Sequence, residues 1–342
     1  TLQELGRLDE AEACFRQAIS LRPNLSEAYS NLGNTLKESK RFEEAEESYT
    51  KAIELRPNYS NAITNRGLCF FERKAFLSAL QDFDFSDTKE SRALALATLY
   101  ALGRTKDIYE RIERQLQQDS LNLRVAAFAS FISEVAEKDT AHNFCKNPLD
   151  FLYFSNISEH LEDSELYIND LVEELLAIEN TWEPTGLTTN GGFQSRAYIN
   201  LFKNPSTQLK RLKSLILKLL DLYYSKYRKE CCSFIEKWPS EKNLHGWYVI
   251  LKRQGYQDWH IHPEGWLSGV VYLKVVPSLE KEEGAIEFGL RGKHYSNPCS
   301  SKLRFSPNQG DIVFFPSSLH HRTVPFKTDE DRIIVSFDLK PY

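Results

Sequence analysis

Four histidines and one arginine in the C-terminal part of the chain have the types and the spacing of a metal site. His260 and His262 stand two residues apart, and the adjacent pair His320 and His321 follows later. Side chains two apart on a strand point to the same side, so His260 and His262 can face one interior. Imidazole is the commonest metal ligand in proteins, and a third ring from a later strand would complete a triangle around one ion.

The later pair offers only one ring to that interior, because neighbours on a strand point to opposite sides. The spacing of Gly310-Asp311, Pro316 and His321 is similar to the spacing around the late histidine of cupin-type barrels. We therefore interpret His321 as the metal ligand and His320 as its neighbour. Arg332 follows on the next predicted strand, where its forked and permanently charged guanidinium would suit a carboxylate.

Short strands must position these residues. Beyond Trp238-Pro239, β-branched and aromatic segments alternate with Gly, Pro, Asn and Ser, which predicts a jelly-roll or double-stranded β-helix. Helices predicted at 167–180 and 209–223 would flank it, since the second has an apolar stripe opposite a row of lysines. The predicted strands are 247–251, 267–276, 284–290, 302–305, 311–315 and 332–339.

A polar, glycine-rich segment at 188–195 precedes the second helix. Its paired glycines are not followed by the Lys-Ser/Thr of a phosphate-binding P-loop. We interpret it as a turn or a loop near the active site, leading into an apolar strand at 198–202.

The N-terminal part of the chain repeats itself. When residues 1–34 are aligned with 35–68, about half of the positions carry identical residues, including the triplet Leu-Arg-Pro at 21–23 and 55–57. A period of 34 with a helix-turn-helix pattern closely resembles tetratricopeptide (TPR) repeats. The register continues through a third unit and a shortened fourth unit at about 91–118, and a helix at 121–136 is expected to cap the solenoid.

The predicted fold class is therefore α + β, in two domains. A TPR solenoid spans 1–137, and the polar segment that ends in Asn147-Pro148 separates it from a jelly-roll domain at 148–342. The chain begins within a repeat, so we expect it to be part of a longer protein.

Composition excludes some classes of partner. The 43 basic and 48 acidic residues are interspersed and give a net charge of -5, which argues against nucleic acid as a partner. The longest apolar run, near 215–222, contains Lys218 and Asp221, so no membrane span is expected. Six cysteines without a CxxC pair or a disulfide framework are typical of reduced thiols, and we expect a cytoplasmic protein.

The motifs together resemble those of the Fe(II)/2-oxoglutarate-dependent oxygenases. The resemblance is densest over the C-terminal part of the chain and extends loosely to Leu149. The matching residues are His260-Ile261-His262-Pro263, Leu267-Ser268-Gly269-Val270, Tyr272-Leu273, Phe315-Pro316-Ser317, His321 and Arg332.

This resemblance implies an oxygenase with Fe(II), 2-oxoglutarate as cosubstrate and O2. Such enzymes convert 2-oxoglutarate to succinate and carbon dioxide while a substrate C–H bond is hydroxylated. It implies that His262 and His321 belong to the metal centre and that Arg332 binds the far carboxylate of 2-oxoglutarate. Tyr272 matches a position from which a tyrosine hydroxyl assists in prolyl-hydroxylase-like members.

The third metal ligand can be assigned in more than one way. The usual early motif is His-x-Asp or His-x-Glu, which His262-Pro263-Glu264 would satisfy. His260 and His262 can instead fill both places, giving three histidines as in some cupin dioxygenases. A two-histidine site like that of the aspartyl/asparaginyl β-hydroxylases is a further option. We favour His260, His262 and His321.

The leading hypothesis is a dioxygenase that hydroxylates a peptide or protein held on the concave face of the TPR repeats. One alternative is a three-histidine cupin-type dioxygenase that does not use 2-oxoglutarate. The other is a TPR binding protein without catalysis. Arg332 argues against the first alternative, because only a carboxylate-bearing cosubstrate needs it.

Overall fold

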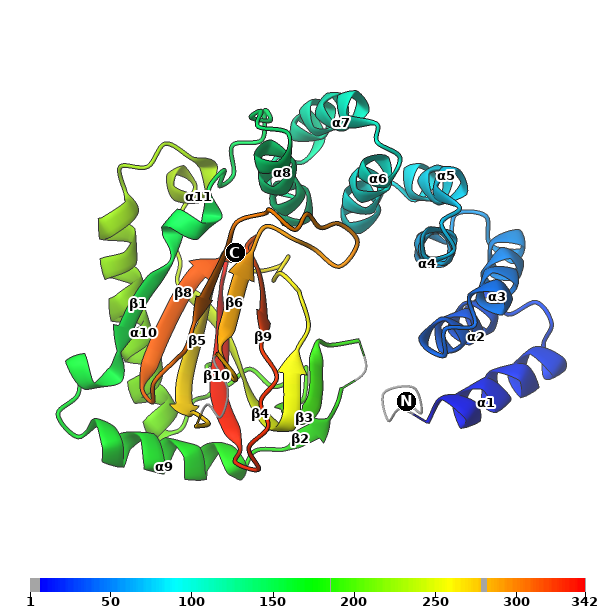
Figure 1. Cartoon of the computed structure of the whole chain (residues 1–342). Helices are drawn as coiled ribbons and strands as arrows, with labels where there is room; N and C mark the ends of the chain where they lie inside the picture. The colour runs from blue at the N-terminus through cyan, green and yellow to red at the C-terminus, as the bar shows by residue number, and fades with distance from the viewer. Residues whose placement is uncertain (1–6, 185, 278–281, 342) are drawn as a thin grey trace. The chain divides into compact units, whose positions relative to one another are not determined.

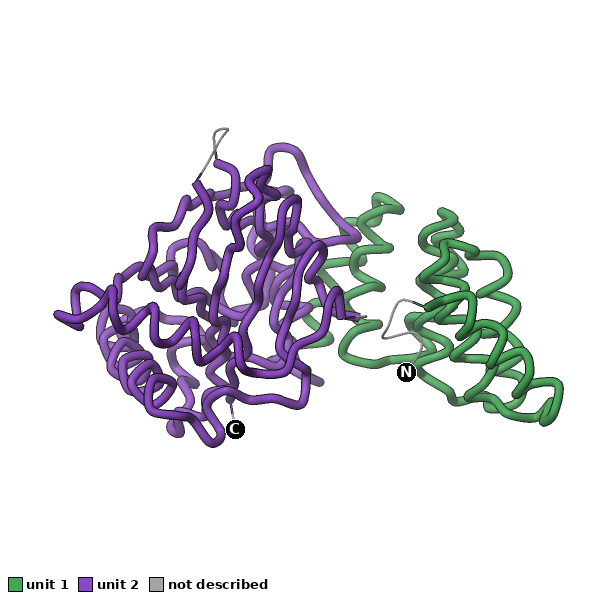
Figure 2. The backbone as a smooth tube through the Cα atoms, turned by 90° about the horizontal axis from the view of Figure 1, so that it is seen from below, with its two compact units in different colours: residues 1–115 green, residues 116–342 purple. Residues whose placement is uncertain are grey.

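The computed structural model describes residues 7–184, 186–277 and 282–341. The chain divides into two compact units, residues 1–115 and 116–342, which Figure 2 shows in different colours. This division precedes the predicted boundary between 137 and 148. None of the helices in the described residues is long and apolar enough to cross a membrane.

The first unit consists of helices that follow one another as helix-turn-helix pairs, as the repeat predicts. Small residues let neighbouring helices approach closely: a Cβ atom on Gly33 would lie only 2.6 Å from Cε1 of Tyr49. The helices are α1 (Leu8–Leu21), α2 (Ser26–Glu38), α3 (Phe42–Leu55), α4 (Ser60–Glu72), α5 (Phe76–Ser86), α6 (Lys89–Ala101) and α7 (Thr105–Gln118).

Helix α8 (Leu123–Val135) belongs to the second unit, although the sequence predicts it as the cap of the solenoid. Its residues Leu123 and Ala126 join the hydrophobic core of the second unit, and Phe128 and Phe131 pack against Tyr295 with ring centroids 4.8 Å and 4.7 Å apart. The apolar pattern of α8 predicts that the helix is buried. It does not say which neighbour covers it, and this is why the predicted boundary differs.

Two antiparallel sheets form the second unit, in agreement with the predicted jelly-roll (Figure 1). The larger sheet has the order β1-β8-β5-β10-β4-β3-β2, and the smaller one has the order β7-β6-β9. The larger sheet contains β1 (Tyr153–Asn156), β2 (Asn180–Trp182), β3 (Thr189–Ser195), β4 (Asn243–Gln257), β5 (Leu267–Lys274), β8 (Asp311–Pro316) and β10 (Arg332–Lys340). The smaller one contains β6 (Ile286–Gly289), β7 (Lys302–Phe305) and β9 (His320–Thr323).

Strand alternation separates the core from the pocket. On β10, Ile333, Val335 and Phe337 belong to the hydrophobic core, whereas Arg332 and Ile334 line a pocket on the other face. The core is completed by α9 (Ser164–Leu176) and α10 (Thr207–Tyr227), which Figure 1 shows beside the larger sheet. Two 3-10 helices, η2 (Pro148–Phe151) and η3 (Ile157–Glu159), and the short α11 (Ser233–Glu236) connect these elements.

The glycine-rich segment is a strand, not the predicted turn or loop, and 198–202 forms turns, not a strand. It forms β3, which pairs with β4 through a register shift between Asn190 and Gly192. A Cβ atom on Gly192 would lie 2.4 Å from the carbonyl oxygen of Ile250. The glycines therefore allow a close approach of two backbones, which single-sequence patterns do not distinguish from a flexible loop.

Candidate active site

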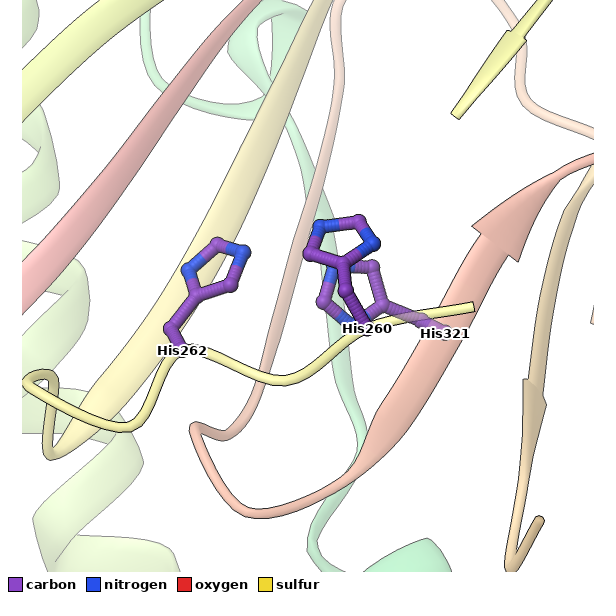
Figure 3. A group of neighbouring side chains, drawn as sticks. All are labelled: His260, His262 and His321. Atoms are coloured by element: carbon purple, nitrogen blue, oxygen red, sulfur yellow. The ribbon is translucent and has the colours of Figure 1, made fainter. Parts of the chain in front are cut away.

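Three imidazoles meet between the two sheets. One ligand atom from each of His260, His262 and His321 lies within 4.8 Å of the others, and no other such group of three occurs in the described residues. The ring centroids are 4.2 Å apart for His260 and His321, 5.0 Å for His262 and His321, and 5.2 Å for His260 and His262. Figure 3 shows the rings facing one space, two from one connecting segment and one from β9. This spacing suits three ligands of a single metal ion.

Backbone hydrogen bonds hold the two segments in this arrangement. The amide of His260 donates to the carbonyl of His321 at 3.1 Å, and the amide of His321 donates back at 3.0 Å. The amide of His262 donates to the carbonyl of Ser317 at 3.0 Å. His260 and His262 thus lie in a bridged connection, not within a strand, but the bridge gives them the shared side that the sequence predicts.

Each of the three rings has its Nδ1 atom beside an oxygen atom. The partners are the carbonyl of Asp258 for His260 at 2.7 Å, the carbonyl of Leu319 for His321 at 3.2 Å, and the Asp338 carboxylate for His262 at 2.6 Å. A proton on Nδ1 satisfies these oxygens and leaves Nε2 free as the metal-binding atom. The surroundings therefore select the tautomer that a metal site needs.

Burial keeps the imidazoles of His260 and His321 in the neutral form that binds metals. It lowers the pKa of His260 to about 3 and the pKa of His321 well below its usual range. His320 is also buried, which lowers its pKa to about 3, but its ring faces Tyr295 at 5.7 Å and does not join the group. This placement supports the choice of His321 over its neighbour.

Glu264, the alternative third ligand, does not reach the histidines. Its side chain is 76% exposed, and Oε1 lies 3.9 Å from a guanidinium nitrogen of Arg124. Its carbonyl oxygen accepts a hydrogen bond from Lys340. The geometry therefore favours the three-histidine set over the triad with Glu264.

Arg332 lines the same pocket, and two of its three guanidinium nitrogen atoms are unsatisfied. The residue is 1% exposed, and its Nε and Nη1 atoms are buried with no hydrogen-bond partner. Burial lowers the pKa of Arg332, and no carboxylate among the described residues forms an ion pair with it. Tyr272 lies beside it, with its ring centroid 5.0 Å from Cζ of Arg332 and its hydroxyl also unpartnered. Buried donors without partners are rare, so these atoms are suited to an anionic ligand.

The donor set fits iron with 2-oxoglutarate. Three neutral imidazoles could hold the ferrous ion on one face, and Arg332 with Tyr272 could hold a carboxylate elsewhere in the same pocket. A ligand with two carboxylates could then bridge the two groups.

Sequence reasoning assigned no role to three residues near this centre. Asp338 binds His262, while Gln257 and Trp247 line the pocket. Strand alternation could have identified Asp338 and Trp247. Asp338 is an even number of residues from Arg332 on β10 and so faces the same side. Trp247 pairs with Ser336, which also faces inward. Gln257 follows an irregularity in the pairing of β4 with β3, so counting along the strand does not show which side it faces.

Family models match both units. Residues 245–338, which include the three histidines and Arg332, match a model described as "Putative 2OG-Fe(II) oxygenase". Residues 26–59 match a tetratricopeptide repeat model, and residues 2–39 match a model described as TPR repeat. A comparison with curated proteins found no match.

Solved structures resemble each part of the chain. A prolyl-4-hydroxylase from Pseudomonas putida is 12% identical over 56% of this chain and 92% of its own, with a TM-score of 0.40. MamA is 16% identical over 40% of this chain and 82% of its own, with a TM-score of 0.36. The first TPR of Spaghetti (RPAP3), bound to an HSP90 peptide, is 21% identical over 30% and 85%, with a TM-score of 0.29.

Proposed function

We propose that the second unit, an Fe(II)- and 2-oxoglutarate-dependent oxygenase domain by its family match, hydroxylates a peptide or protein bound by the TPR repeats. We assign His260, His262 and His321 as the iron ligands. Arg332 and Tyr272 are assigned to the far carboxylate of 2-oxoglutarate.

One observation carries the assignment of the site. The three imidazoles and the unpaired guanidinium of Arg332 line a single buried pocket. A metal site alone would not require a buried arginine without a counter-ion, whose desolvation is costly. The arginine therefore supports a carboxylate-bearing cosubstrate, and it disfavours a three-histidine dioxygenase that uses oxygen alone.

The residues of the chain divide the work. When bound, iron and 2-oxoglutarate supply the oxidation that turns O2, 2-oxoglutarate and a substrate C–H group into succinate, carbon dioxide and a C–OH group. The histidines hold the metal through Nε2, because their Nδ1 atoms are engaged. Arg332 neutralises and orients the far carboxylate, and the buried pocket limits the access of water.

Anaerobic titration tests this assignment. The intact protein should bind one equivalent of Fe(II), and adding 2-oxoglutarate should produce the weak visible charge-transfer band of its chelate. Arg332→Ala should weaken 2-oxoglutarate binding, so that a higher 2-oxoglutarate concentration is needed to produce this band. The assignment fails if the intact protein gives no band, and oxygen uptake that is independent of 2-oxoglutarate would favour the cupin-type alternative.

The substrate class rests on the repeats. TPR helices present partly exposed polar side chains that can meet a peptide: Lys37 on α2 donates to Asn65 on α4 at 2.5 Å, and Asn34 accepts from Tyr49 at 2.7 Å. The test is succinate formation by the full chain with a library of proteome-derived peptides, followed by mass spectrometry for one added oxygen. The Lys37→Ala and Asn65→Ala pair should raise KM for active peptides without changing the Fe(II)–2-oxoglutarate band. If the enzyme oxygenates no peptide of the library but does oxygenate a small molecule that contaminates it, the proposed substrate class is wrong.

A further inference from the structure

Three histidines leave the proposed iron site without a negatively charged ligand. Two histidines and one carboxylate would reduce the charge of a ferrous centre by one, whereas three neutral imidazoles do not. Among the described residues that line the pocket, Arg332 adds a positive charge and none is an aspartate or a glutamate. Glu264 is 76% exposed and does not line the pocket. A carboxylate that contacts one of the ligands without binding the metal would therefore have a larger effect than usual on the charge of the centre.

Asp338 is placed to fill this need. It lies on β10 and is 5% exposed, and its Oδ1 atom is 2.6 Å from Nδ1 of His262. Ser268 on β5 donates to the same oxygen at 2.7 Å and lies 2.8 Å from the hydroxyl of Ser317. The other oxygen, Oδ2, is 3.3 Å from the ammonium of Lys340. Of the three histidines, only His262 has a side-chain carboxylate on its Nδ1 atom; the other two meet neutral carbonyls.

We infer that Asp338 supplies, through His262, the negative charge that the three-histidine iron site lacks. This inference rests on the proposed function, because it requires His262 to bind the metal. A carboxylate that accepts the Nδ1 proton makes Nε2 a stronger donor. Asp338 is thus a positioning residue that also lowers the Fe(III)/Fe(II) potential, since added electron density at iron favours the ferric state.

Asp338→Asn tests the charge while keeping the shape of the side chain. Fe(II) affinity should fall by roughly 10- to 100-fold. The Fe(III)/Fe(II) potential, measured by spectroelectrochemistry without cosubstrate, should rise, and the charge-transfer band with 2-oxoglutarate should move to higher energy. Asp338→Glu should restore part of the affinity. Glu264→Gln is the matched control: it removes a charge two residues from His262 and should change none of these quantities.

Lys340→Met provides a second test, which can be measured even if Asp338→Asn does not fold. Its side chain is partly exposed and lies beside Oδ2, so its removal increases the effective charge of Asp338. The potential should then fall, in the direction opposite to Asp338→Asn.

The outcomes separate this inference from the proposed function. If the wild-type protein binds no Fe(II), the iron-site assignment itself is wrong. If it binds Fe(II) and shows the 2-oxoglutarate band, but Asp338→Asn matches Glu264→Gln in affinity and potential, only the role of Asp338 is wrong. An unchanged or raised potential in Lys340→Met would also contradict that role.

Discussion

The guanidinium of Arg332 lies 5.0 Å from the ring centroid of Tyr272, and neither residue uses all of its buried donors. Burial disfavours the charged form of Arg332 and raises the pKa of Tyr272 to about 12, so the tyrosine stays neutral and offers no counter-charge. The pair therefore reduces stability in the absence of a ligand and gains from an anion. Substitution of Arg332 should therefore weaken anion binding but raise the stability of the ligand-free protein.

Arg332→Met should weaken 2-oxoglutarate binding and stabilise the ligand-free protein. Loss of two charged hydrogen bonds corresponds to about 3 kcal/mol or more, which is roughly 100-fold in Kd. Replacing an uncompensated buried charge with a hydrophobic side chain should raise the free energy of unfolding by about 1 to 4 kcal/mol. Anaerobic titration gives the first quantity and urea unfolding of the ligand-free protein gives the second.

Arg253→Met is the control for this prediction. Arg253 lies on β4 of the same sheet, but its side chain is exposed and pairs with Asp329 at 3.1 Å. Its replacement should leave 2-oxoglutarate affinity unchanged and alter stability by less than about 1 kcal/mol. Arg332→Met with reduced stability in the ligand-free state would show that the guanidinium is compensated in the fold.

Periodic patterns made much of this architecture predictable. The period of 34 defined the repeats, and spacing by two placed His260 and His262 on one side of a chain segment. These signals depend on local geometry that every helix or strand shares. Arg332 was singled out by its guanidinium on the strand after His321, and Tyr272 through the resemblance to a family; both residues line the pocket.

Features that depend on distant neighbours were not predictable. The sequence left Glu264 and His260 as alternatives, because the choice depends on how the connection after β4 turns toward β9. The segment containing Gly192 looked like a loop, since only the backbone of Ile250 beside it explains the missing side chain. Asp338 acquires its role only when β10 brings it beside His262, 76 residues away in the chain.

Gly33→Ala should destabilise the repeats. A methyl group on Gly33 would overlap the ring of Tyr49, whose Cε1 and Cδ1 atoms are 2.6 Å and 2.8 Å from the new Cβ position. Overpacking of this kind costs about 1 to 3 kcal/mol, which exceeds the gain of about 1 kcal/mol from alanine in a helix. Thermal unfolding followed by circular dichroism measures the change. Ser20→Ala, at the end of α1, is the control, and an equal or higher melting temperature in Gly33→Ala would contradict the close packing.

His142 should make stability depend on pH in the acidic range. The residue is 3% exposed and its Nε2 atom is buried with no partner, so burial lowers its pKa from 6.5 to about 4. Between these values the unfolded chain binds a proton that the folded chain does not, and stability therefore falls as the pH falls. The full difference corresponds to about 3 kcal/mol, at 1.36 kcal/mol per pH unit.

Urea unfolding at several pH values between 4 and 7 tests this dependence. His142→Leu should flatten the decline in unfolding free energy relative to the wild type, although it also removes the Nδ1 acceptor of the Phe144 amide. The slope is therefore the informative quantity, and the absolute stability is not. Equal slopes in the wild type and His142→Leu would exclude His142 as the source.

A buried polar network on β3 and β4 should show strong coupling between its members. The hydroxyl of Thr189 donates to Oε1 of Gln194 at 2.9 Å and accepts a longer hydrogen bond, 3.4 Å, from Nε2 of Gln257. All three residues are buried, and Gln257 also lines the pocket. Thr189→Val keeps the shape but leaves the two amides unsatisfied, which should cost about 1 to 3 kcal/mol of unfolding free energy.

Gln194→Leu in the Thr189→Val background removes one of the orphaned groups, so the double variant should lose less stability than the sum of the two single variants. A double-mutant cycle by urea unfolding should give a coupling of at least about 0.5 kcal/mol. The Fe(II)–2-oxoglutarate band should persist in all three variants, because neither Thr189 nor Gln194 lines the pocket. Additive losses would mean that the two side chains are satisfied independently, and the network would then have no role in holding Gln257 at the pocket wall.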